Sequence, residues 1–175
     1  MNAPRRAGDR QPPPETVIAI HDLKAHYFFN IDNHRWAELH EVFTEDARFE
    51  GFTFAGEGAA LFVAGVAEFL DGTRSVHHGC MPSLRALSET RVRGRWSMHD
   101  YVTWRPGTRT FRGDCSPDLA GFHGYGYYEE EYQREPTGWR IAFMRLTRLR
   151  IDRIHSGEQD ESLNALRPDF DWLPE

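Results

Sequence analysis

The sequence predicts an α+β fold, with helices in the first part of the chain and antiparallel strands in the second. Up to about residue 70, apolar side chains recur mostly at the three- and four-residue spacing of helices. From about residue 74 onward, apolar and polar side chains alternate over long stretches, which is typical of half-buried strands. Helices that precede a run of strands, rather than alternating with them, place the chain in the α+β class.

Three helices and one short strand are expected in the first part of the chain. The first helix is expected over about residues 15–30, where apolar residues follow helical spacing. A second helix follows the Asp32-Asn33 pair, either member of which can serve as its N-cap. A short, Phe-rich strand is expected over residues 47–54, and a third helix follows it and ends near residue 70.

Four long strands are then expected, and one of them carries an anomaly. They are expected over residues 74–88, 91–105, 121–134 and 138–151. In the second of them a period of two places Asp100 in the apolar row. The rest of that row comprises Val92, Gly94, Trp96, Met98, Val102 and Trp104. Because an isolated buried charge is costly, Asp100 must be paired, hydrogen-bonded or neutral. It is either a structural acid satisfied by an arginine or part of a catalytic site.

The composition argues against a nucleic-acid-binding protein. The 21 basic and 27 acidic residues give a formal net charge of −6, whereas nucleic-acid binders usually show a basic balance or a basic face. The alternating Arg91, Arg93 and Arg95 fit the solvated face of a strand. Two cysteines do not make a disulfide framework.

One domain is expected, over residues 15–152. Residues 1–14 are expected to form a disordered arm because they are rich in proline, and residues 153–175 an irregular tail. The N-terminal segment lacks the apolar run of a signal peptide or a membrane span, so the expected location is the cytoplasm.

Several short segments together resemble a known family. They are Phe43-Thr44-Glu45-Asp46-Ala47, His77-His78-Gly79, Trp96-Ser97-Met98-His99-Asp100, Gly124-Tyr125-Gly126-Tyr127-Tyr128 and Gly138-Trp139-Arg140-Ile141. Their order and spacing resemble a SnoaL-like domain of the nuclear transport factor 2-like superfamily. The resemblance implies a cone-shaped, curved antiparallel sheet wrapped around three helices, with a deep apolar pocket. Polyketide cyclases, scytalone dehydratase, bile-acid dehydratases and ketosteroid isomerases share this fold. So do the non-catalytic β subunits of ring-hydroxylating dioxygenases, and fold alone does not fix function.

The resemblance aligns His77 with the catalytic histidine of the dehydratases. Such a histidine acts as a general base and then as an acid for a departing group. Neighbouring residues of a strand face opposite ways, so only one of His77 and His78 points inward, and His77 is favoured. Either Asp100 or Asp32 is expected to orient the imidazole, and Asp100 is alternatively the base itself. Asp32 is otherwise only a helix cap.

Two further residues are expected to stabilise oxyanion charge. The resemblance implies that Tyr27 donates a hydrogen bond to substrate, although its helical spacing also suits a core aromatic. The period of two places Arg145 in the apolar row of the last strand and Arg148 in the outer row, unless a bulge reverses them. The inner row comprises Trp139, Ile141, Phe143 and Arg145. Arg145 could instead form a structural salt bridge to Asp100 or to a glutamate of the 129–131 run.

The function implied is that of a cofactor-independent lyase or isomerase, a dehydratase or cyclase, acting on an apolar cyclic, polyketide- or steroid-like substrate. The expected substrate-binding residues are Phe49, Phe54, Trp96, Met98, Tyr125, Tyr127 and His78. No cofactor or metal is expected, because the sequence lacks paired metal-ligand spacings, a phosphate loop and a nucleophile elbow. The alternatives are a non-catalytic partner subunit, like a dioxygenase β subunit, or a small-molecule binding domain. The resemblance also implies a homodimer or homotrimer.

Overall fold

The computed structural model describes residues 10–52, 57–156, 168–170 and 172–173. Its helices and strands follow in the expected order. They are α1 (Pro14–Asp32), α2 (Trp36–His40), β1 (Phe43–Glu50), α3 (Ala59–Leu70), β2 (Thr73–Ala86), β3 (Arg91–Trp104), β4 (Leu119–Glu135) and β5 (Gly138–His155). No helix in these described ranges is long and apolar enough to span a membrane.

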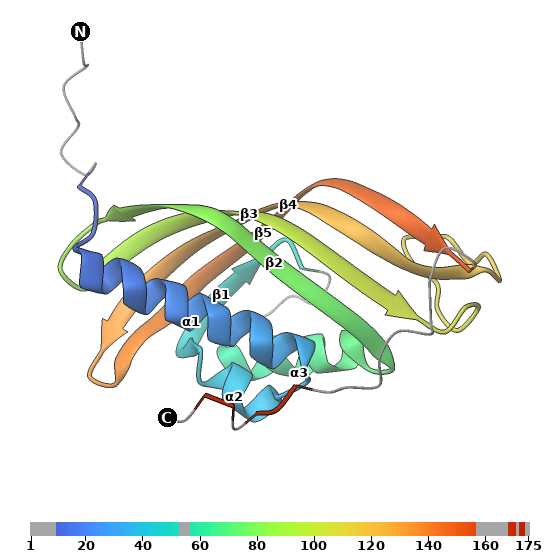
Figure 1. The fold of residues 1–175 in the computed structure, drawn as a ribbon, viewed down its shortest axis with the longest axis horizontal. Helices are drawn as coiled ribbons and strands as arrows, with labels where there is room; N and C mark the ends of the chain where they lie inside the picture. Colours follow the sequence, from blue (N-terminus) through green and yellow to red (C-terminus); the bar gives the residue numbers. More distant parts are fainter. Residues whose placement is uncertain (1–9, 53–56, 157–167, 171, 174–175) are drawn as a thin grey trace, which may run out of the picture.

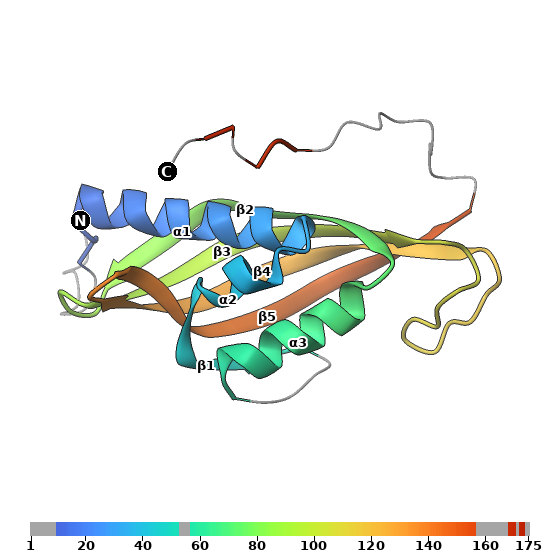
Figure 2. The same cartoon turned by 90° about the horizontal axis from the view of Figure 1, so that it is seen from below.

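The strands form one curved sheet in the order β1-β5-β4-β3-β2. Figures 1 and 2 show all three helices on one face of this sheet. Strands β2 to β5 are antiparallel neighbours, as expected, but β1 pairs with β5 in parallel. A parallel pair needs a long crossover connection, and here α3 and the β2–β4 meander supply it. The α+β class and the curved sheet around N-terminal helices are confirmed.

Several boundaries differ from expectation. Helix α1 begins at Pro14, a position where the missing N–H of proline costs no helical hydrogen bond. Strand β1 begins at Phe43, four residues earlier than expected. Arg35 occupies the N-cap position of α2 and Asp32 is the last residue of α1, so Asp32 does not cap α2. The expected arm and tail lie largely outside the described residues.

Strand β5 contains two β-bulges that change which side chains face the helices. The register with β4 jumps once beside Ala142 and once beside Leu149. Because successive side chains alternate between faces, one extra residue moves every later side chain to the opposite face. After the first bulge the inward row therefore comprises Met144, Leu146 and Arg148. The expected inward placement of Arg145 is wrong for this reason, and so is the expected outward placement of Arg148.

An ion pair lies inside the core. Lys24 is the only lysine of the chain, and its Nζ lies 2.5 Å from Oε1 of Glu130, with both side chains almost completely buried. The other carboxylate oxygen of Glu130 accepts a hydrogen bond from the hydroxyl of Tyr132, which in turn accepts one of 2.7 Å from Nε1 of Trp96. The Lys24 ammonium is thus part of a buried network of hydrogen bonds that connects α1 with β3 and β4.

Candidate active site

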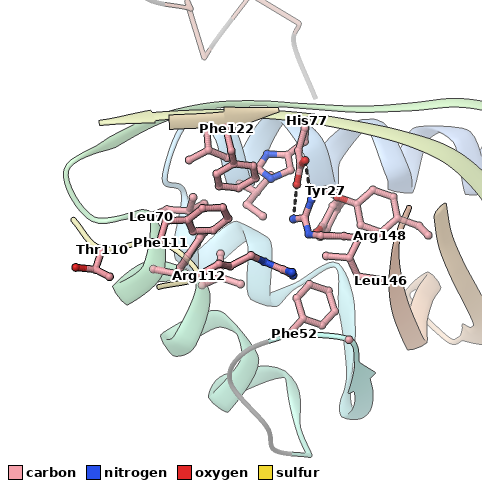
Figure 3. Close-up of a pocket in the computed structure, with 17 residues that line it drawn as sticks. Tyr27, Phe52, Leu70, His77, Thr110, Phe111, Arg112, Phe122, Leu146 and Arg148 are labelled. Carbon is pink, nitrogen blue, oxygen red and sulfur yellow. Dashed lines mark hydrogen bonds and ion pairs between the residues drawn. The ribbon is translucent and has the colours of Figure 1, made fainter. Parts of the chain in front are cut away.

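A cavity of about 320 Å³ lies between the sheet and the helices. Figure 3 shows the side chains that line it. Most of the lining is apolar, from α1, α3, the sheet and the loop between β3 and β4. The polar lining residues are Tyr27, His77, Asp100, Thr110, Arg112, Tyr128 and Arg148. A concave, mainly apolar site with a few convergent polar groups is the usual form of a small-molecule site.

His77 reaches this cavity from β2 and is held by Asp32 at the end of α1. The Asp32 carboxylate accepts hydrogen bonds from the Ser75 hydroxyl and the His77 backbone N–H, both at 2.8 Å. Its Oδ1 also lies 2.6 Å from Nδ1 of His77. An ionised carboxylate only accepts hydrogen bonds, so Nδ1 carries the proton and Nε2 keeps the basic lone pair. Asp32 therefore fixes both the tautomer and the orientation of the imidazole.

Asp100 is paired with Arg148 and not with His77. The two guanidinium nitrogens donate to its two carboxylate oxygens at 2.8 and 2.5 Å, the fork geometry that arginine favours. Burial by itself lowers the pKa of Arg148, but the hydrogen bonds and charge of Asp100 outweigh it and raise that pKa. Asp100 is only 1% exposed, so the burial that its strand parity predicts is confirmed, and its partner is the arginine of the bulged strand.

Gly124 leaves the space that this ion pair occupies. Gly124 pairs with Asp100 across β3 and β4, and a Cβ at Gly124 would lie 2.0 Å from Oδ1 of Asp100 and from Nη1 of Arg148. We expect Gly124→Ala to displace the pair and to lower the free energy of unfolding by roughly 1–3 kcal/mol, as overpacking does. Urea denaturation followed by tryptophan fluorescence measures this loss. An unchanged midpoint would show that the pair has room to move.

Two tyrosines complete the polar side of the cavity. Tyr27 of α1 and Tyr128 of β4 both line it, and their rings meet edge to face with centroids 6.0 Å apart. Burial raises the pKa of Tyr27, and the Glu130 carboxylate adds to this. Burial also raises the pKa of Tyr128, with a further contribution from Tyr27. Both phenols therefore stay protonated, and because a side-chain hydrogen bond joins them, one hydroxyl proton of the pair is left to donate to an oxygen in the cavity.

The structure thus brings His77, Asp32, Asp100 and Tyr27 to one site, but not Arg145. Arg145 lies on the opposite face of β5, where it forms ion pairs with Glu50 at 2.7 Å and Glu129 at 3.4 Å. The competing expectation of a salt bridge to a glutamate of the 129–131 run is confirmed for Glu129. The catalytic roles of the other four residues stay predictions.

Most of the expected substrate-binding residues lie elsewhere. His78, Tyr125 and Tyr127 point to the outer face of the sheet, the face away from the helices. There the His78 and Tyr125 rings flank His99 with centroids 6.0 and 4.8 Å away, and Arg95 lies over Tyr127. The pairing of Asp100 with Gly124 puts even-numbered residues of β4 inward, so these tyrosines could not line the cavity.

The remaining expected contacts are core residues. Trp96 and Met98 are buried but do not line the cavity. Phe49 stacks on Phe62 at a centroid distance of 3.8 Å and also lies outside the lining. Phe54 falls outside the described residues.

Sequence reasoning assigned no site role to Arg112, and it placed Arg148 outside. The bulge that turns Arg148 inward leaves no local signal, since it arises from pairing with β4. Arg112 lies in a loop rich in glycine and proline, where no periodicity applies. Among the described residues, no cluster of three or more His, Cys, Asp or Glu side chains could hold a metal ion.

Comparisons with known proteins agree with this architecture. A family model described as SnoaL-like domain matches residues 15–145. A candidate scytalone dehydratase from Novosphingobium aromaticivorans shares 17% identity, with 79% of this chain and 87% of that chain covered and a TM-score of 0.66. A type 2 hexachlorocyclohexane dehydrochlorinase, LinA, shares 14% identity over 85% of this chain and 95% of its own, with a TM-score of 0.69.

A third solved structure, the type 3 LinA dehydrochlorinase of Novosphingobium barchaimii, shares 16% identity over 88% of this chain and 96% of its own, with a TM-score of 0.63. At such identities the similarity to these structures shows the fold. The family model covers well over half of the chain, and the chain therefore belongs to the SnoaL-like domain family.

Proposed function

We propose that this protein is a cofactor-independent lyase or isomerase that removes a proton from a carbon atom of an apolar cyclic substrate. One observation carries the proposal: His77 faces an apolar cavity while its Nδ1 is held by Asp32 at 2.6 Å. A neutral imidazole with its second nitrogen engaged by a carboxylate is suited to general base catalysis near neutral pH.

The reaction begins when Nε2 of His77 takes a proton from a carbon next to a carbonyl or another electron-withdrawing group. The electron pair of the broken C–H bond moves toward that group, and the hydrogen-bonded pair of Tyr27 and Tyr128 donates a hydrogen bond through its free hydroxyl proton to the oxygen that gains charge. The imidazolium is stabilised by the Asp32 carboxylate. It then returns the proton either to a departing hydroxyl, which completes a dehydration, or to another carbon, which completes an isomerisation.

The shape and polarity of the cavity support this reading over the alternatives. A non-catalytic partner subunit is expected to have its cone filled by side chains, whereas a cavity of about 320 Å³ is present here. A plain binding domain has no need of a histidine fixed by two hydrogen bonds to one carboxylate. The names dehydratase and dehydrochlorinase of the structural neighbours both describe eliminations.

The proposal can be tested without the natural substrate. The isoxazole ring of 5-nitrobenzisoxazole opens when a base removes its single C–H proton, which releases a coloured phenolate. We expect the wild-type protein to catalyse this opening with saturation kinetics, as a base positioned in a binding cavity does. A rate no greater than that of free imidazole at the same concentration would contradict a positioned base.

A further inference from the structure

The loop between β3 and β4, residues 105–118, forms one wall of the cavity. The ring of Phe111 stacks on Phe122 of β4 with centroids 4.4 Å apart and planes 3° from parallel. Arg109 donates hydrogen bonds to the backbone carbonyl oxygens of Phe69 and Asp71, where the C-terminal end of α3 presents free carbonyl groups. The loop is therefore attached to both the sheet and α3.

Directly after these attachments, Arg112 takes a backbone conformation that residues with a side chain seldom adopt. Its φ is +50°, in the left-handed region. It lines the cavity, and Figure 3 shows its side chain extending from the loop into the cavity, on the side lined by Phe52 and Phe111. Such strained residues cluster at ligand sites, where the surrounding structure holds them. No hydrogen bond or ion pair joins the Arg112 guanidinium to any described residue.

The charges of the cavity are otherwise balanced in pairs. Both terminal nitrogens of Arg148 are engaged by Asp100, and His77 is engaged by Asp32. Within the part of the chain that the structure describes, Arg112 is therefore the cavity-lining cation that has no carboxylate partner. The whole chain carries a net charge of −6, so a cation at this place is not part of a general basic surface.

We propose that Arg112 binds a carboxylate of the substrate, which makes the substrate class an apolar cyclic acid. Guanidinium and carboxylate groups match in a planar, two-bond geometry, and one unpaired arginine balances one negative charge. The apolar walls then hold the ring, while the carboxylate is held at the Arg112 guanidinium. That the bound acid is a substrate rests on the proposed function, whereas binding of the acid by Arg112 does not require turnover.

The experiment compares two probes of nearly the same shape, 1-naphthoate and neutral 1-naphthamide, by titration calorimetry. We expect the wild-type protein to bind the acid about tenfold more tightly than the amide, as a charge-assisted hydrogen bond allows. Arg112→Gln should remove that preference and leave the dissociation constant of the amide unchanged. Arg105→Gln is the matched control, because Arg105 begins the same loop, is exposed and does not line the cavity.

Three results would overturn the proposal. These are a wild-type protein that shows no preference for the acid, a preference that survives Arg112→Gln, and a preference that is lost in His77→Gln, which would place the anion on the imidazole. A stronger preference for 1-naphthyl phosphate would replace the carboxylate by a phosphate. If the protein fails to open 5-nitrobenzisoxazole but still prefers the acid through Arg112, the proposed function fails and the carboxylate subsite stands.

Discussion

Replacing His77 by glutamine is expected to lower kcat/KM for opening of 5-nitrobenzisoxazole by about 10²- to 10⁴-fold, the usual contribution of a positioned general base. Glutamine keeps most of the volume and can still donate a hydrogen bond to Asp32, but it has no basic nitrogen. The fold should persist, because the side chain borders a cavity rather than the close-packed core. Initial rates give the change in activity, and far-UV circular dichroism checks the fold.

His78 provides the matched control. It is the next residue of β2, and it lies on the outer face with its ring 6.0 Å from that of His99. His78→Gln makes the same chemical change to the same strand, so its activity should equal that of the wild-type protein. Equal losses in both variants would mean that the strand, and not the base, was disturbed. Full activity in His77→Gln would remove His77 from the mechanism.

The parts of the site that the sequence predicts are those set by local alternation. The burial of Asp100 follows from the period of two in β3. For β2 the same period indicates only that one of His77 and His78 faces inward; the resemblance favours His77, and the structure places His77 on the cavity. Strands β2 and β3 pair with one register shift, which lies beyond His77 and Asp100. The same pairing places His77 directly opposite Asp100. The helical stripe of α1 likewise places Tyr27 against the sheet. When only one face of a helix or strand is buried, the pattern of apolar residues indicates that face even if the elements packed against it are unknown.

The parts that could not be predicted depend on pairing between distant segments. Asp32, and not Asp100, is the partner of His77 because the C-terminal end of α1 lies next to β2. The two residues are 45 positions apart in the sequence, so local patterns do not indicate this contact. The exchange of Arg145 for Arg148 is decided by the bulge beside Ala142. The sequence around Ala142 gives no sign of the bulge, because a bulge is an extra residue in one strand relative to the neighbouring strand.

Lys24 carries a sequence signal of the same kind as Asp100. Its position falls on the apolar stripe of α1, and it is the only lysine among 21 basic residues. A charge on an apolar stripe requires a partner for the same reason as Asp100. The partner, Glu130, is on an inward position of β4, which becomes apparent only once the register of β3 and β4 is known. The Lys24 ammonium also lies over the faces of Tyr27 and Tyr128, 3.9 and 4.0 Å from the ring centroids.

Replacing Lys24 by methionine is therefore expected to lower the free energy of unfolding by about 3–5 kcal/mol, because it leaves a buried carboxylate without its cation. Burial lowers the pKa of Lys24, and the charge of Glu130 opposes that shift. The attraction between the two charges thus offsets the free energy that is lost when the Lys24 ammonium and the Glu130 carboxylate are removed from water. Urea denaturation of the single variant measures the loss. Arg150→Met, which removes an exposed pair with Asp152, should cost only about 0–1 kcal/mol.

The double variant Lys24→Met/Glu130→Gln separates the charge from the packing. The amide oxygen of glutamine can still accept the hydrogen bond from Tyr132, and no ionised group remains buried at this place. Removal of both charges of a buried ion pair avoids the uncompensated buried charge, so the double variant should recover much of the loss, reduced by the cost of the buried glutamine N–H groups that lack an acceptor. A double variant as unstable as Lys24→Met would mean that the lysine stem and its contacts with Tyr27 and Tyr128, not its charge, hold this part of the core together.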